Sequence, residues 1–227
     1  MLVLGPRIAI RPNDPDRWPL DEHLAREILA RVPGSESEDG HSPASLRHAA
    51  ESYLHFSKER ETLELDVQEF YGRDALTTTT FHRNLAELPF RLCIIASPDS
   101  LMLRAFEEAG KSPQRGYYSV RPASIPRLVS PTFDKPLVYY LFGHYEDSRS
   151  LVLTEGDLIK FLVAVVRKDP PVPDQVRSLL NAPEASFLFL GFGFHNWYLR
   201  VLLEVLEYIQ AQQHCLRRQP FLRESRA

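Results

Sequence analysis

The chain has 227 residues, 44% of them hydrophobic and 25% charged, which is an ordinary globular composition with enough apolar residues for a sizeable core. Its 27 basic and 30 acidic residues give a formal net charge of -3, so nothing indicates a nucleic-acid or membrane-binding surface. No apolar run reaches the ~20 residues of a membrane span, and two distant cysteines make neither a disulfide framework nor a zinc pair. We therefore expect a soluble, cytoplasmic protein without a metal site.

The first third of the chain is predicted to hold one short strand and several helices. Residues 2–4, Leu-Val-Leu, are typical of a short buried strand before Gly5. The spacing of apolar residues predicts a helix over residues 18–32 and two more over residues 45–72. The polar segment from Pro33 to Pro43 is predicted to be a loop.

The next segments predict a helix, a strand and a helix. Residues 77–89 predict a helix that Pro89 ends. The strongest strand is predicted over residues 90–97, a continuous apolar run that includes Cys93 and is typical of a strand buried on both faces. The helix after it is predicted over residues 98–110, with Pro98 at its start and Asp99 in its first turn.

The remaining segments continue the alternation of strands and helices. Thr154 and Asp157 form a helix-start signal of the capping-box kind. The predicted elements are strands over 115–121 and 135–143, a short strand and then a helix over 150–166, a helix over 172–181, a strand over 186–191, and a last helix from Asn196 to about Arg217.

This alternation predicts an α/β fold with a Rossmann-like parallel sheet covered by helices on both faces. In such sheets, ligands bind beyond the carboxyl ends of the strands. The loops that follow Leu4, Ile95 and Leu190 all lie at that edge in the predicted arrangement. They are therefore the candidate ligand-binding loops.

Four stretches in this order resemble the motifs of sirtuin-like NAD-binding domains, in particular the divergent branch found in bacterial defence and conflict systems. They are LVLGPRIAI, PFRLCIIASPDSLMLRAFEEAG, PLVYYLFGHYEDSRSLVLTEGDLIKFL and FLFLGFGFHNWYLRVLL. The resemblance covers residues 1–10 and 88–205. It implies a single domain over residues 1–227, in which a helical insert over residues 38–88 takes the place of the zinc module of true sirtuins.

The resemblance implies NAD or ADP-ribose as the ligand, with a purely structural role and no ligand as the alternative. Glycines would let backbone N–H groups approach a pyrophosphate. An arginine could bind a phosphate by its charge or only lie at the domain surface. An aspartate could contact the ribose or orient its loop, or it could only be a first-turn acid that favours the helix dipole. An asparagine could contact adenosine or only cap a helix. The implied cofactor-binding residues are Gly5, Arg7, Asp99, Gly191, Gly193 and Asn196.

At the positions that carry the family's chemistry, this sequence departs from the pattern. Ser97 stands where the family has a catalytic asparagine, and Phe142 stands where it has a catalytic histidine. A phenyl ring cannot transfer a proton. His144 is a candidate substitute, because residues two apart in an extended chain point to the same side; the alternative is a surface loop histidine.

Two functions are therefore compatible with the sequence. The first is a catalytically degenerate sirtuin-like domain that serves as a structural, assembly or nucleotide-sensing module and works with other protein subunits or by self-association. The alternative is an active NAD hydrolase or ADP-ribose-handling enzyme that uses His144, Asp99 and Ser97 in altered roles. Losing a general base normally lowers the rate ~10²–10⁴-fold, which favours the first.

Overall fold

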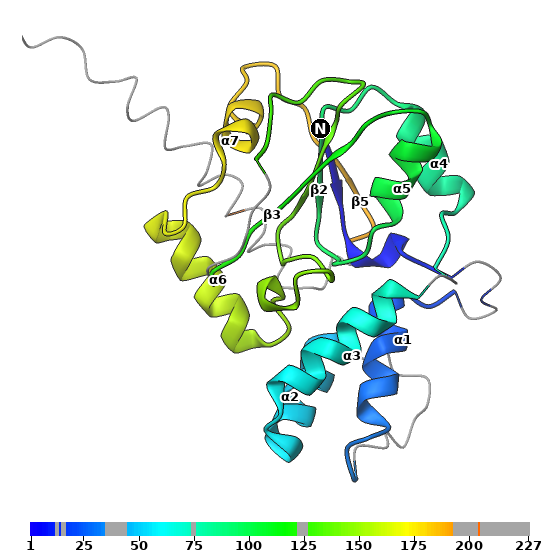
Figure 1. The fold of residues 1–227 in the computed structure, drawn as a ribbon, viewed down its shortest axis with the longest axis vertical. Helices are drawn as coiled ribbons and strands as arrows, with labels where there is room; N and C mark the ends of the chain where they lie inside the picture. Colours follow the sequence, from blue (N-terminus) through cyan, green and yellow to red (C-terminus); the bar gives the residue numbers. More distant parts are fainter. Residues whose placement is uncertain are drawn as a thin grey trace, which may run out of the picture.

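The computed structural model describes residues 1–11, 14, 17–34, 45–73, 76–121, 127–192 and 204. Within them, five parallel strands form one sheet in the order β3-β4-β2-β1-β5 (Figure 1). The strands are β1 (Leu2–Leu4), β2 (Leu92–Ile95), β3 (Gln114–Tyr117), β4 (Leu137–Tyr140) and β5 (Leu188–Leu190). The predicted α/β fold with a parallel sheet is confirmed.

The pairing register brings the ends of the strands together at one edge of the sheet. Leu4 pairs with Ile95 on one side and with Leu190 on the other, and Ile95 also pairs with Tyr140. Each of these residues is the last of its strand. The segments that follow β1, β2, β4 and β5 therefore begin side by side at the carboxyl edge.

Helices cover both faces of the sheet, as predicted. Alternate strand residues point to opposite faces, so Val3 and Ile94 lie in one core cluster with α6 (Glu155–Arg167) and α7 (Asp174–Leu180). On the other face, Leu4 and Cys93 pack with α4 (Thr80–Glu87) and α5 (Leu101–Glu108). Cys93 is fully buried, as its place in an apolar run predicts.

A separate cluster of three helices lies beyond the carboxyl edge of the sheet (Figure 1). It consists of α1 (Leu20–Leu29), α2 (Leu46–Ser57) and α3 (Arg60–Gly72), which share an apolar core. α4 falls within the predicted insert, residues 38–88, yet it packs on the sheet beside α5. The boundaries of the insert and of the single domain over residues 1–227 stay predictions.

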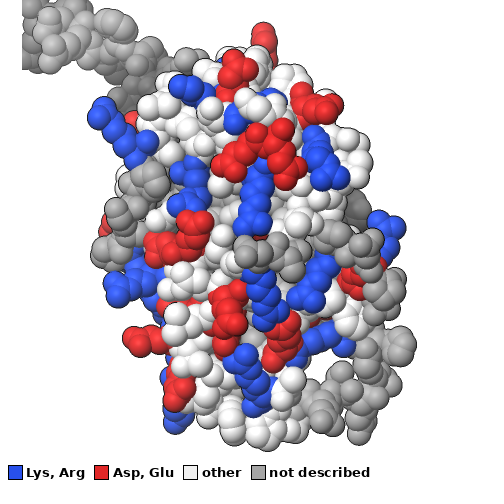
Figure 2. Space-filling view, turned by 45° about the vertical axis from the view of Figure 1, so that its right-hand side comes forward, with Lys and Arg blue, Asp and Glu red and all other residues white. Residues whose placement is uncertain are grey.

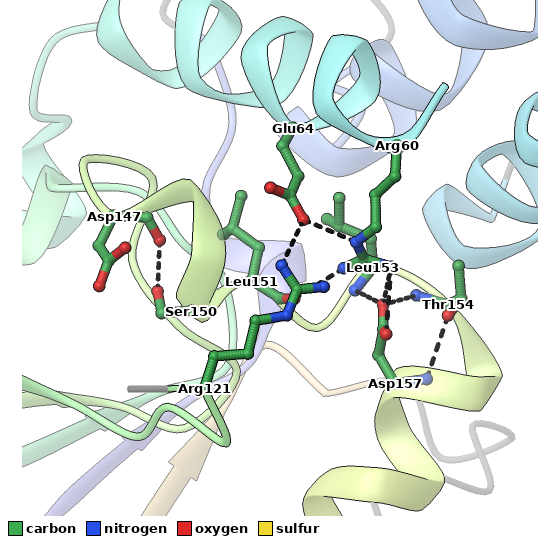
Figure 3. Close-up of polar contacts among 9 residues, drawn as sticks. All are labelled: Arg60, Glu64, Arg121, Asp147, Ser150, Leu151, Leu153, Thr154 and Asp157. Carbon is green, nitrogen blue, oxygen red and sulfur yellow. Dashed lines mark hydrogen bonds and ion pairs between the residues drawn. The ribbon is translucent and has the colours of Figure 1, made fainter. Parts of the chain in front are cut away.

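A charged network joins the helical cluster to the sheet domain (Figure 3). Arg60 of α3 donates to Glu64 at 2.6 Å and, through Nη1, to both carboxylate oxygens of Asp157 at 3.1 and 2.9 Å. Arg121, beyond β3, also donates to Glu64, at 3.1 Å. Arg60 further donates to the Leu151 carbonyl at 3.4 Å. Three segments far apart in the sequence thus meet at two arginines and two carboxylates.

Most predicted helices begin and end near their predicted limits, but two details were wrong. The short strand expected near residues 150–153 is absent; Ser148–Ser150 form a 3-10 turn instead. α5 begins at Leu101 with Ser100 as its N-cap, so Pro98 and Asp99 precede the helix. The capping box of Thr154 and Asp157 at the start of α6 is confirmed.

Some predicted segments lie outside the described residues, namely most of the loop from Pro33 to Pro43 and the last helix from Asn196 onward. Among the helices that are described, none is long and apolar enough to cross a bilayer. Figure 2 shows acidic and basic side chains interspersed over the face that it presents.

Candidate functional site

A cleft of about 240 Å³ opens at the carboxyl edge of the sheet, against the helical cluster. The segments after β1, β2 and β4 form one wall, and the starts of α1 and α2 contribute to the other. Its lining residues that matter for chemistry are Arg7, Asp21, Glu22, Arg47, Ser97 and Phe142. The structure thus brings together three of the residues that the sequence predicts for the site, Arg7, Ser97 and Phe142.

The glycines of the first and last loops pack against each other. A Cβ on Gly5 would overlap with the carbonyl oxygen of Gly191. A Cβ on Gly191 would lie 2.5 Å from Cγ2 of Ile8, and the φ of Gly191 is +76°, in the region that favours glycine. Both glycines are therefore required for the close approach of two backbone segments.

In this close packing, backbone N–H groups that could bind a pyrophosphate already donate to backbone carbonyls. The Gly5 N–H donates to the Leu190 carbonyl at 2.8 Å, and the Arg7 N–H donates to the Gly191 carbonyl at 3.1 Å. Pro6 has no N–H to offer. The residues of this loop do not fit a backbone phosphate cradle; what the loop offers to the cleft is the exposed side chain of Arg7.

Ser97 and Asp99 are paired with each other after β2. The Ser97 hydroxyl donates to the Asp99 carboxylate, whose other oxygen accepts the Leu101 N–H at 2.9 Å. Both side chains are buried, and Asp99 does not line the cleft. Asp99 thus orients its loop and accepts the first N–H group of α5.

Phe142 and His144 have opposite environments although they are two residues apart. Phe142 lines the cleft, where its ring packs on Phe161 and lies 5.3 Å from the Arg47 guanidinium carbon. Between the two, Gly143 has a φ of +85°, so the chain turns and is not extended. His144 is consequently fully buried and is absent from the cleft lining.

His144 is held in the core by polar contacts at both ring nitrogens. Its Nδ1 accepts the Glu146 N–H at 3.3 Å, so the hydrogen resides on Nε2, which donates to the Ser100 hydroxyl at 3.1 Å. Burial, followed by the charge of Arg115, lowers the pKa of His144 to about 3. The imidazole is therefore neutral at physiological pH, and it does not line the cleft.

Asp21, in the first turn of α1, is a cleft residue that the sequence analysis missed. Burial raises its pKa to about 6, although the Glu22 N–H and the charge of Arg47 act in the opposite direction. In the sequence, an acid at this position reads only as a favourable partner of the helix dipole. Arg47, in the first turn of α2, was also missed. The sequence does not show that the first turns of α1 and α2 face the cleft, because their direction depends on tertiary packing.

The remaining predicted residues, Gly193 and Asn196, lie outside the described residues. The cleft that is described combines two arginines, two carboxyls and apolar walls. These groups fit the phosphate, sugar and ring parts of a nucleotide through side chains. The described lining residues of the cleft include no histidine and no asparagine.

In a comparison with protein families, the model described as a SIR2-like domain matches residues 98–221, more than half of the chain. The match begins after β2 and takes in the segments of Phe142 and Gly191. No curated protein matches the chain.

Proposed function

The chain belongs to the SIR2-like domain family, and from this premise we propose that it binds NAD or ADP-ribose in the cleft without performing the sirtuin reaction. In this proposal the domain is a nucleotide-sensing or assembly module that works with other protein subunits, or with copies of itself, in a defence-type system. SIR2-like domains typically bind NAD, which supports the choice of ligand.

The observation that carries the proposal is the state of the two catalytic positions. Phe142 lines the cleft with a ring that cannot accept a proton, and the Ser97 hydroxyl is committed to the Asp99 carboxylate. The nearest histidine in sequence, His144, is buried below them with both ring nitrogens engaged. A missing general base lowers a rate ~10²–10⁴-fold, and missing donors at developing charge lower it a further ~10²–10³-fold.

Binding of a nucleotide without catalysis requires only positive charge for the phosphates and apolar surface for a ring. Arg7 and Arg47 supply positive charge for phosphates, and Phe142 and Leu46 supply apolar surface for a ring. The cleft volume of about 240 Å³ lies just below the ~300–1,000 Å³ of typical ligand pockets. It therefore suits one half of a dinucleotide.

Calorimetry of the purified full chain with NAD and ADP-ribose tests the proposal, combined with an assay for released nicotinamide. We expect binding, a melting temperature raised by the equivalent of ~2.7 kcal/mol at 100 times the dissociation constant, and nicotinamide release no faster than in a heat-denatured sample. Arg7→Ala should weaken binding about tenfold, whereas Arg149→Ala, an exposed arginine outside this cleft, should not. Absence of binding by both ligands would refute the proposal.

The alternative, an active NAD hydrolase, is favoured by a different observation, the carboxyl of Asp21 in the cleft with a pKa raised to about 6. A carboxyl with such a pKa can take the proton of an attacking water near neutral pH. In that case nicotinamide release would be rapid, and it would be lost in Asp21→Asn. His144 and Asp99, the residues that the sequence suggested for this activity, do not line the cleft.

A further inference from the structure

We infer that Asp21 recognises the sugar of the bound nucleotide by accepting hydrogen bonds from its hydroxyl groups. This inference rests on the proposed function, because it names the contact that a nucleotide makes in the same cleft. It adds a specificity-determining residue that lies outside the region matched by the family model, residues 98–221.

The two carboxyls of the cleft differ in their partners. Glu22 is paired with Arg26, whose Nη2 lies 3.2 Å from Oε1, across one turn of α1. Asp21 forms no ion pair with any described residue, although it lies in the same helical turn and lines the same cleft. Of the two, Asp21 is therefore the carboxyl whose charge is not already balanced by a contact.

The groups around Asp21 come from three neighbouring elements. Glu22 of α1 and Arg47 of α2 act on its charge, and Arg7 lines the same cleft from the loop after β1. Tyr71 of α3 lies close enough to Asp21 for the two groups to interact electrostatically. Burial raises the pKa of Tyr71 well above its ordinary value, and the negative charges of Asp21 and Asp99 raise it further. The Tyr71 hydroxyl is buried without a hydrogen-bond partner among the described residues.

The chemistry of a carboxylate selects the part of the ligand that it contacts. An ionised carboxylate only accepts hydrogen bonds, and it repels phosphate. A ribose offers neighbouring hydroxyl donors, while Arg7 and Arg47 provide the positive charge that phosphates require. The sugar is thus the part of a nucleotide that suits Asp21.

This contact makes binding depend on pH, with a defined sign. The pKa of Asp21 in the free protein is about 6, so the carboxyl is ionised at pH 7.5 and largely protonated at pH 5. Sugar hydroxyls that donate to the carboxylate favour the ionised form. Affinity should therefore fall as the pH decreases through about 6.

The test measures the dissociation constant of ADP-ribose for the full chain between pH 5 and pH 8, a range in which this ligand does not titrate. We expect about tenfold weaker binding at pH 5 than at pH 7.5. Asp21→Asn should bind about tenfold more weakly at pH 7.5, and its affinity should be nearly independent of pH. Glu107→Gln, which removes an exposed carboxyl of α5 outside the cleft, is the control, and it should keep the wild-type pH profile.

Inorganic pyrophosphate at pH 7.5 separates sugar recognition from a general effect on the cleft. Asp21→Asn should bind it as tightly as the wild type or more tightly, and equal weakening of both ligands would overturn the inference. If ADP-ribose binds at all pH values with the same affinity, the inference fails and the proposed function stands. If it does not bind at all, the proposed function itself fails. If Asp21→Asn does not fold, the pH profile of the wild type, compared with that of Glu107→Gln, still tests the inference.

Discussion

His144 illustrates how a single residue can carry the right chemistry in the wrong place. Its ring lies 4.5 Å from that of Tyr140 and 4.7 Å from that of Tyr145, measured between centroids, and no part of it is exposed. Contacts of this kind hold a core together, and they leave no path to a ligand in the cleft. At the residue scale, the imidazole therefore serves stability.

We predict that His144→Gln lowers the free energy of unfolding by about 2–4 kcal/mol at pH 7 and leaves the affinity for ADP-ribose unchanged. The folded-state pKa of about 3 lies below the ordinary value of 6.5, so this histidine stabilises the fold above pH 6.5 and loses that contribution as the pH falls. Between pH 7 and pH 5 the wild type should lose about 2 kcal/mol through it. Urea unfolding at both pH values measures this, with the exposed His55→Gln as control; an equal pH dependence in wild type and His144→Gln would contradict it.

At the scale of elements, the junction of β1 and β5 depends on two glycines. Gly5 and Gly191 follow the last residues of these strands, and they allow the segment after β1 to donate backbone hydrogen bonds to the carbonyls of Leu190 and Gly191. The glycine-containing loops after β1 and β5, which resemble a phosphate cradle in sequence, thus attach the edge strand β5 to its neighbour β1.

Gly191→Ala should destabilise the protein by about 3 kcal/mol or more, because the new Cβ meets both backbone strain and the Ile8 side chain. Gly110→Ala is a matched control: Gly110 also has a φ of +75°, but nothing lies within 4 Å of its Cβ position. Its cost should stay near 1 kcal/mol. Thermal and urea melts of both variants provide the comparison, and equal losses would show that crowding at Gly191 is unimportant.

At the scale of the whole molecule, the network of Arg60, Glu64, Arg121 and Asp157 connects the helical cluster to the sheet domain (Figure 3). Asp157 also accepts the N–H groups of Leu153 and Thr154, both at 3.2 Å. Burial alone would raise the pKa of Asp157, but the charge and hydrogen bonds of Arg60 and the hydrogen bonds of Thr154 outweigh it and lower the pKa. The carboxylate stays ionised where the two parts of the molecule meet.

Asp157→Asn should therefore lower the free energy of unfolding by about 2–4 kcal/mol at pH 7, because it removes one of the two carboxylates that balance the charge of Arg60 and leaves only Glu64. A lowered pKa means that the ion pair stabilises the fold above the ordinary value of 3.8 and that this contribution is lost as the pH falls below it. The difference between variant and wild type should shrink toward pH 3 in urea unfolding. Asp174→Asn removes an exposed pair with Arg177 and should cost less than 1 kcal/mol; a similar loss in both variants would contradict the role of the network.

The sequence by itself determined the order of the elements, because that order is encoded locally. Apolar runs predicted β2 and β5, the Thr154–Asp157 signal predicted the start of α6, and alternation predicted a parallel sheet whose loops gather at one edge. The prediction that Phe142 and Ser97 stand at the family's catalytic positions comes from the resemblance of short motifs and stays a prediction. Each of these features depends on residues within a few positions of one another.

Only the tertiary structure decided what the candidate site contains. Gly5 and Gly191 contact each other across the chain, His144 turns into the core after Gly143, and Asp21 faces the cleft from a helix outside the sheet. These outcomes depend on how segments many residues apart pack together. A local pattern cannot show whether a glycine admits a ligand or another backbone, or whether an acid at a helix start faces solvent or a cleft.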